Sequence, residues 1–150
     1  MVRTWTKYLT LIPVCGVVFF LLMTSQGTPQ DADLTTREVI DRFNEAFNRH
    51  EADALEAMFT DDTVFENTSP APDGKRIEGK AAVAAYWREW FERNPDARFD
   101  EEEMIVAGNR AVVLWVYRKM RDGKPWHLRG VDVFTVRDGK VAAKLAYVKG

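Results

Sequence analysis

Asp132 is the residue whose type and position in the sequence most clearly allow chemistry. It lies in the stretch 128–148, which predicts two strands joined by a tight turn, because Asp138-Gly139 is typical of two-residue hairpin turns. Side chains alternate between the two faces of a strand. One face of the first strand then carries Leu128, Gly130, Asp132, Phe134 and Val136, and the other carries His127, Arg129, Val131, Val133 and Thr135. A single carboxylate therefore lies in an apolar row.

An ionised carboxylate on an apolar face needs compensation, because burying it without a partner costs several kcal/mol. Two interpretations are open. Asp132 is a structural residue bonded to the backbone or to an arginine, or it is an acid that lines a cavity and acts on a ligand. Metal binding is not favoured, since His127 has the opposite parity on the same strand and faces away from Asp132. We expect no metal and no cofactor.

Residues 1–27 have the pattern of an export signal. Arg3 and Lys7 precede an apolar run, and no acidic residue occurs before Asp31. A cleaved signal peptide and an uncleaved N-terminal membrane anchor both fit this pattern, and they predict a periplasmic, secreted or membrane-anchored protein. The remaining chain has no cysteine, and its basic residues are scattered among acids rather than clustered. This charge pattern does not favour nucleic acid as a partner, and a membrane contact is expected only through residues 1–27.

The rest of the chain, 46% apolar overall, predicts one domain of helices followed by strands. Residues 28–34 form a polar linker, and the capping-box pattern Thr35-Thr-Arg-Glu38 begins a helix over 36–49. A short second helix carries Leu55, Met58 and Phe59, and a third begins after Gly79 and ends at Asn94-Pro95. Strands are expected at 63–67, 98–107, 110–120, 126–136 and 141–149, with a loop at 68–74.

The strand from Ala111 to Arg118 is apolar on both faces, and Val131 and Val133 make the outer face of the Asp132 strand apolar as well. A sheet that is covered by helices on one side and apolar on the other needs a partner. We therefore expect a homodimer through the outer face of the sheet.

The order of elements resembles a known family. The turn Asp61-Asp62-Thr-Val-Phe-Glu-Asn67, the helix start at Gly79 and the segment Gly130-Val-Asp-Val-Phe-x-Val-x-Asp-Gly-Lys140 are similar to nuclear transport factor 2-like, SnoaL-like domains. The resemblance covers residues 35–150. It implies an α+β fold in which three N-terminal helices pack on a strongly curved mixed or antiparallel sheet that forms a conical pocket.

The resemblance also implies roles for particular positions. Ketosteroid isomerases of this fold pair a general-base Asp with an oxyanion hole of Tyr and protonated Asp, and these positions fall on Asn67, Phe43 and Asp132. Asn has no useful basicity and Phe has no hydroxyl, so steroid-type proton transfer is not expected. Limonene-type epoxide hydrolases hold water with Tyr, Asn, Arg and two Asp. At the matching positions this chain keeps Asn67 but has Phe65, Trp115, Tyr117 and Ala146 in place of the others.

Polyketide-cyclase-like members need little more than one positioned acid or base, which Asp132 supplies. We therefore expect a domain that binds a small, mostly apolar molecule bearing a carbonyl or hydroxyl group, with acid/base chemistry at Asp132 and Asn67 as a polar orienting group. The alternative is a non-catalytic ligand-binding or dimeric assembly module of the same fold. The expected pocket walls are Phe43, Phe65, Trp87, Trp90, Trp115, Tyr117 and Phe134.

Overall fold

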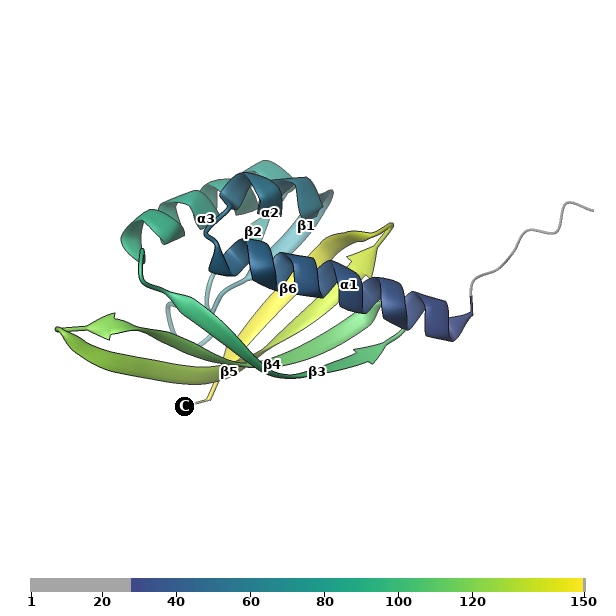
Figure 1. The fold of residues 1–150 in the computed structure, drawn as a ribbon. Coiled ribbons are helices and arrows are strands. Elements are labelled where there is room, and N and C mark those ends of the chain that lie inside the picture. Colours follow the sequence, from purple (N-terminus) through teal and green to yellow (C-terminus); the bar gives the residue numbers. More distant parts are fainter. Residues whose placement is uncertain (1–27, 150) are drawn as a thin grey trace, which may run out of the picture.

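The computed structural model describes residues 28–149 as helices packed on one mixed sheet (Figure 1). The helices are α1 (Pro29–Asn48), α2 (Ala52–Met58) and α3 (Lys80–Arg93). The strands are β1 (Phe59–Glu66), β2 (Arg76–Glu78), β3 (Arg98–Ala107), β4 (Arg110–Arg121), β5 (Lys124–Arg137) and β6 (Lys140–Val148). The strand order is β2-β1-β6-β5-β4-β3, in which β1 and β6 run parallel and all other neighbours antiparallel. The α+β class and its three helices are therefore as predicted.

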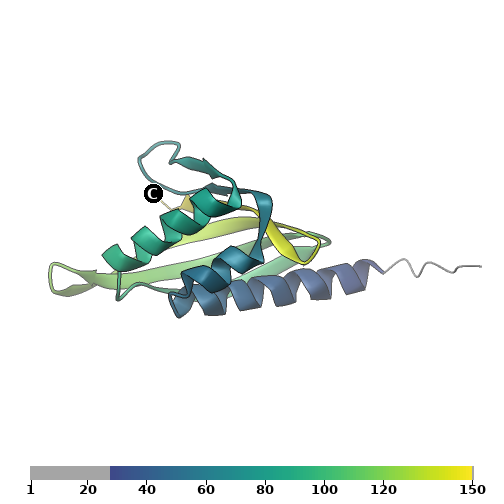
Figure 2. The same cartoon turned by 90° about the horizontal axis from the view of Figure 1, so that it is seen from above.

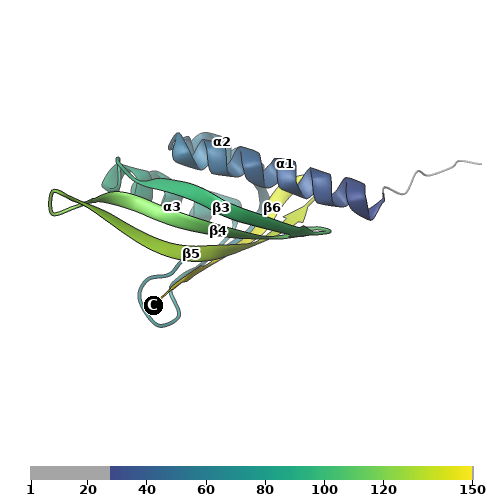
Figure 3. The same cartoon turned by 60° about the horizontal axis from the view of Figure 1, so that its bottom comes forward.

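All three helices lie on the same face of the sheet, and the long strands β4 and β5 bend beneath them (Figures 2 and 3). Helix α1 contacts β3, and α3 contacts β1. The apolar residues of α1 recur at helical spacing, so Val39, Ile40, Phe43 and Phe47 all face the sheet and are buried. This helix-covered face is called the inner face of the sheet below, and it contains the hydrophobic core.

Helix α1 begins at Pro29, which corrects the predicted start at Thr36 and places residues 29–34 in the helix rather than in a linker. Thr28 is the N-cap, and its side chain and that of Asp31 form a reciprocal capping box, with Pro29 in the first turn. Thr36 instead donates a hydrogen bond to the Gly108 carbonyl at 2.8 Å. The sequence contains two possible caps, and the first of them starts the helix.

Most other boundaries lie within two residues of those predicted, and the larger differences concern β1 and β2. Strand β1 starts at Phe59, which the sequence had placed in the second helix, and the short strand β2 was not predicted. Phe59 pairs with Val141 of β6, and this long-range pairing ends the helix at Met58. The β5–β6 hairpin is confirmed, with positive φ angles of 53° at Asp138 and 69° at Gly139, as a type I′ turn requires.

A one-residue bulge in β6 decides which side chains face the helices. Val136 pairs with Val141, whereas Thr135 pairs with Ala143, so Ala142 is an extra residue on β6. The extra residue shifts the alternation of side chains by one position. Val141 before the bulge and Lys144 after it, three residues apart, therefore both lie on the inner face. Lys144 thereby pairs with Phe134, two residues from Asp132 along β5.

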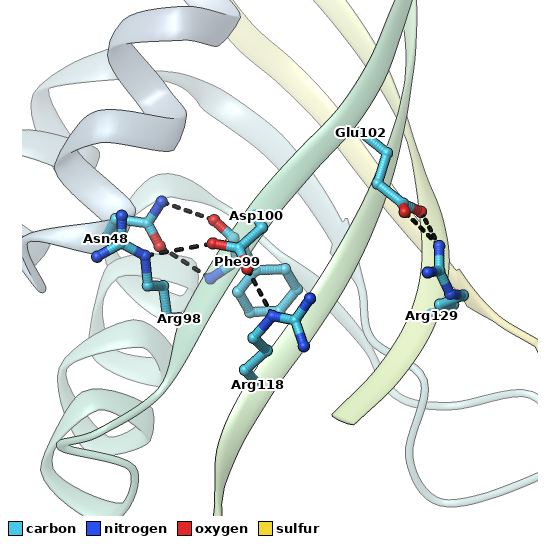
Figure 4. Close-up of polar contacts among 7 residues, drawn as sticks. All are labelled: Asn48, Arg98, Phe99, Asp100, Glu102, Arg118 and Arg129. Carbon is cyan, nitrogen blue, oxygen red and sulfur yellow. Dashed lines mark hydrogen bonds and ion pairs between the residues drawn. The ribbon is translucent and has the colours of Figure 1, made fainter. Parts of the chain in front are cut away.

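Charged residues cover part of the outer face of the sheet (Figure 4). Arg118 donates to Asp100 at 2.6 Å, and this hydrogen bond holds the pKa of Asp100 below its usual value. Arg129 of β5 reaches Glu102 of β3 across the intervening strand β4. Val116 pairs with both Asp100 and Arg129 and is only 2% exposed. The outer face is therefore less apolar than the sequence suggested.

The predicted export signal or membrane anchor, residues 1–27, lies outside the described residues. Within 28–149, no helix combines the length and the hydropathy that crossing a membrane requires.

Candidate functional site

A cavity of about 210 Å³ lies between α3 and the inner face of the sheet. Aromatic side chains form most of its wall, and its charged groups come from β4, β5 and β6. The lining residues are Phe65, Asn67, Thr68, Tyr86, Trp87, Trp90, Asn94, Phe99, Trp115, Tyr117, Lys119, Leu128, Asp132, Lys144, Ala146 and Val148.

The buried part of this cavity contains an ion pair. Lys144 Nζ lies 2.7 Å from Asp132 Oδ2, and the two side chains are 8% and 7% exposed. The ammonium also lies 5.3 Å from the ring centre of Phe65, 5.6 Å from that of Phe134 and 5.8 Å from that of Trp87. These distances are in the range of cation–π attraction, which compensates part of the cost of removing Lys144 from water.

Several polar atoms around the ion pair have no partner among the described residues. They are Asp132 Oδ1 and the indole nitrogens Nε1 of Trp87 and Trp115, all buried. Buried polar groups nearly always form hydrogen bonds, and an indole N–H is a donor only. Asp132 and Lys144 also line a second cavity of about 20 Å³ below Phe43 and Phe99, which has room for one water. The site is therefore ready to accept further hydrogen-bonding groups.

Asn67 holds the loop at one rim of the cavity. Its Oδ1 accepts hydrogen bonds from the backbone N–H of Lys75 at 2.7 Å and of Ser69 at 3.2 Å. Its Nδ2 donates to the Tyr86 hydroxyl at 3.2 Å. Burial raises the pKa of Tyr86, and the hydrogen bond from Asn67 acts in the opposite direction. Asn67 thus positions both the loop and Tyr86 through its amide group.

A second polar group lies on β4, at the end of the cavity nearer solvent. Lys119 Nζ donates to Asn94 Oδ1 at 3.1 Å, and the Tyr117 hydroxyl donates to the same oxygen at 3.5 Å. Burial raises the pKa of Tyr117 to about 12, so the phenol is neutral at physiological pH. Among residues 28–149, no group of three His, Cys, Asp or Glu side chains is placed to hold a metal ion.

The SnoaL-like domain family matches residues 40–144 of the chain. The protein belongs to the SnoaL-like family. A nuclear transport factor 2-like protein of unknown function from Mesorhizobium loti is 41% identical and has a similar structure, with a TM-score of 0.71 over 82% of this chain and 98% of that one. No match was found among curated proteins.

More distant structures share the SnoaL-like fold. A Jannaschia protein provisionally described as a SnoaL-like polyketide cyclase is 18% identical, with a TM-score of 0.69 over 83% of this chain and 90% of that one. An LEH-like epoxide hydrolase from M. tuberculosis is also 18% identical, with a TM-score of 0.64 over 78% and 84% of the two chains. At this identity the likeness shows the fold alone.

The structure brings most of the predicted site residues of this SnoaL-like protein together. Asp132, Asn67 and five of the predicted wall residues line the cavity, namely Phe65, Trp87, Trp90, Trp115 and Tyr117. Phe43 and Phe134 do not line this cavity, but Phe43 lines the smaller cavity of about 20 Å³ together with Asp132 and Lys144. Both are almost fully buried in the core, where their rings lie 5.4 Å apart.

Sequence reasoning missed Lys144. Simple alternation from the buried Val141 places Ala143 and Leu145 on the inner face and Lys144 on the outer face. The bulge at Ala142 reverses this assignment. One signal in the sequence pointed to the correct register. Ala146, which pairs with Asp132, matches the position of a pocket acid in epoxide hydrolases of this fold. Lys144 is two residues from Ala146 on the same strand, so the two side chains share a face, and this match places Lys144 toward the pocket.

Proposed function

We propose that the cavity binds a small, mostly apolar molecule whose carbonyl or hydroxyl oxygen reaches the Asp132–Lys144 pair, and that Asp132 performs acid/base chemistry on it. The observation that carries the proposal is the buried ion pair at 2.7 Å in an aromatic cavity, with Asp132 Oδ1 unpartnered within residues 28–149. The volume of about 210 Å³ fits a small ligand, since sites for drug-sized molecules begin at about 300 Å³.

The pair supplies two groups that enolisation requires. The Asp132 carboxylate takes a proton from the carbon next to a ligand carbonyl, and the electron pair of that C–H bond moves to the carbonyl oxygen. The Lys144 ammonium donates a hydrogen bond to the resulting enolate oxygen and stabilises its charge. If the enolate is conjugated with a C=C bond, it takes the proton back from Asp132 at the far carbon of that bond, which is an isomerisation. If it instead attacks a second carbonyl, a ring closes, and the resulting alkoxide takes the proton from Asp132. Because the two side chains touch, a carbonyl bound to Lys144 lies next to the base.

The aromatic wall supports an apolar ligand. Trp87, Trp90 and Trp115 surround the space from two sides, and their faces suit a planar or aliphatic body. The unpartnered indole N–H groups of Trp87 and Trp115 offer donors for ligand oxygens. A ligand with one or two oxygens on a hydrophobic body matches this set of groups.

A second candidate is a non-catalytic binding module. The ion pair itself favours this alternative, because Lys144 already satisfies one oxygen of Asp132 and fixes its position. In that case the pair only recognises the ligand oxygen, and no proton is transferred from carbon.

A two-part experiment tests the proposal. Binding of hydrophobic ketones, lactones and phenols is measured by thermal shift for the wild type, Asp132→Asn and Lys144→Met. A ligand at a hundred times its dissociation constant adds about 2.7 kcal/mol to the free energy of unfolding, provided that it binds only the folded state. Exchange of α-protons of each bound ketone in deuterated water is then followed by nuclear magnetic resonance.

We expect binding that weakens in both variants, and α-proton exchange that Asp132→Asn abolishes. Binding without exchange would support the binding module and reject catalysis. If no ligand stabilises the wild type, the proposed function is wrong. Circular dichroism of the variants distinguishes loss of the site from loss of the fold.

Two further proposals concern the whole protein. Export or membrane anchoring rests on residues 1–27, where Arg3 and Lys7 precede the apolar run. The homodimer rests on the outer face of the sheet, where Ile105 is 53% exposed and Tyr147 is 51% exposed.

A further inference from the structure

We infer that the ligand of this cavity is an apolar acid whose carboxylate binds Lys119, while its carbonyl or hydroxyl group reaches the Asp132–Lys144 pair. This inference rests on the proposed function and adds the chemical class of the ligand.

The charges that line the cavity do not balance. The charged lining residues are one acid, Asp132, and two lysines, Lys144 and Lys119, so the lining carries a net positive charge. Asp132 is paired with Lys144 at 2.7 Å. Among residues 28–149, Lys119 takes part in no ion pair, and its polar partner is the neutral amide oxygen of Asn94 at 3.1 Å. A half-buried ammonium without an anion attracts one, and a ligand carboxylate supplies it.

The position of Lys119 is fixed rather than free. Asn94 Nδ2 donates to the Trp90 carbonyl at 2.8 Å, and this contact orients Asn94 Oδ1 toward β4. Lys119 Nζ also lies 5.9 Å from the centre of the Tyr117 ring, within the range of cation–π attraction. A lysine held in place by neutral groups loses little conformational entropy when it binds an anion.

One acid near this end of the cavity, Asp96, is hydrogen-bonded to the backbone rather than to Lys119. Asp96 acts on the pKa of Tyr117 through its charge, but its Oδ2 accepts a hydrogen bond from the backbone N–H of Met120 at 2.6 Å. Asp96 is exposed, whereas Lys119 is half-buried and lines the cavity. Its carboxylate therefore does not replace a ligand anion beside Lys119.

The sheet register separates the two polar groups along the cavity. Asp132 pairs with Val113, and Lys119 lies six residues further along β4, where it pairs with Trp126. At about 3.4 Å per residue, the two backbone levels are roughly 20 Å apart, and the long lysine side chain shortens the gap. The cavity wall between these levels includes Trp115, Tyr117 and Leu128. This arrangement suits an elongated ligand with an apolar body and a polar group at each end.

The test uses matched acids and amides on the full-length chain. The probes are (4-acetylphenyl)alkanoic acids, from 4-acetylphenylacetic acid to 6-(4-acetylphenyl)hexanoic acid, each with its primary amide. Each pair has the same ketone and body and differs in the charge of one end. Dissociation constants are measured by calorimetry for the wild type, Lys119→Gln, Lys119→Arg and Lys124→Gln. Lys124 is an exposed lysine of β5 that does not line the cavity, so Lys124→Gln makes the same change in net charge elsewhere.

We expect one acid to bind the wild type about tenfold more tightly than its amide, which is the effect of one charge-assisted hydrogen bond. Lys119→Gln abolishes this preference without weakening the amide, whereas Lys119→Arg and Lys124→Gln retain it. Equal binding of acid and amide to the wild type would overturn the inference and leave the proposed function intact. A preference that persists in Lys119→Gln would also overturn it. If neither member of any pair binds, the proposed function fails, and the inference fails with it.

Discussion

Lys144 Nζ and Asp132 Oδ2 lie 2.7 Å apart, on neighbouring strands, with both side chains more than nine-tenths buried. Such a pair is weak evidence for stability, because the desolvation of both charges offsets their attraction. An apolar pair of similar volume fills a core equally well. Under the proposed function, this pair on the wall of a cavity recognises a ligand.

Removing one partner of this pair should be costly, because it leaves an unpaired buried charge. We expect Lys144→Met to lower the free energy of unfolding by about 3–5 kcal/mol. The double variant Asp132→Leu with Lys144→Met should recover a large part of that loss, since no buried charge remains. Urea unfolding followed by circular dichroism measures the two single variants, Lys144→Met and Asp132→Leu, and the double variant. A double variant that loses the sum of the two single effects would show that the charges are not coupled.

Gly130 gives Trp115 the space that its indole ring occupies. A Cβ atom at this position would lie 2.4 Å from Trp115 Cη2 and 2.3 Å from the Tyr147 carbonyl oxygen. We expect Gly130→Ala to cost about 1–3 kcal/mol and to displace Trp115. The near-ultraviolet circular dichroism of the tryptophans should change. Gly123→Ala is the control, because it meets no atom within 4 Å and strains only the hairpin backbone. A change of equal size in both spectra would contradict the packing argument.

Tyr117 should make the protein less stable at alkaline pH. Its pKa is raised by burial to about 12 in the folded state and is about 10 in the unfolded state. Between these values the unfolded chain binds fewer protons than the folded one. The free energy of unfolding therefore falls as pH rises from 10 to 12, and the contribution is fully present below pH 10.

The measurement for this prediction is urea unfolding across that pH range. The decrease should be smaller in Tyr117→Phe, which cannot ionise. Tyr147→Phe is the matched control, since Tyr147 is 51% exposed, and its decrease should equal that of the wild type. Identical pH profiles for all three proteins would be inconsistent with the raised pKa.

Asn67 is expected to act through the loop that it holds, not through proton transfer. Asn67→Ala removes the acceptor of the Ser69 and Lys75 backbone N–H groups and should cost about 2 kcal/mol. Asn67→Asp keeps that acceptor, and the Tyr86 hydroxyl can turn to donate to its second oxygen, so it should retain most of the stability. Thermal unfolding compares the two. Equal losses in both variants would indicate that the loop contacts contribute little.

The proposed homodimer forms through the outer face of the sheet. Leu114 lies on this face, and Leu114→Glu places a charge there that a partner copy cannot bury. We expect sedimentation to show a dimer for the wild type and a monomer for Leu114→Glu. Ala82→Glu introduces the same charge on an exposed position of α3 and should remain dimeric. A wild type that is monomeric at all concentrations would reject the homodimer.

The sequence was most informative where local pattern and tertiary structure agree. The hairpin at Asp138-Gly139 and the alternation along β5 correctly placed Asp132 on the inner face, because that strand continues without interruption past it. The aromatic spacing of α3 likewise placed Trp87 and Trp90 on the side of the helix that lines the cavity. Together with the order of elements, these local signals were enough to predict the family.

The predictions that failed depended on contacts between distant segments. The start of α1 depended on which of two caps formed, and the end of α2 depended on pairing of Phe59 with β6. Phe43 and Phe134 are apolar aromatic residues like those that line the main cavity. Residue type alone therefore could not distinguish core residues from residues that line this cavity.

The sequence by itself determined the fold, the position of Asp132 on the inner face and most of the aromatic residues that line the cavity. These follow from helix and strand periodicity, which is a property of neighbouring residues. Only the tertiary structure decided that Lys144 is the partner of Asp132. The register between β5 and β6 includes the extra residue Ala142, and this bulge turns Lys144 toward the inner face. A bulge depends on pairing between strands, so the alternation of residue types along one strand does not reveal it.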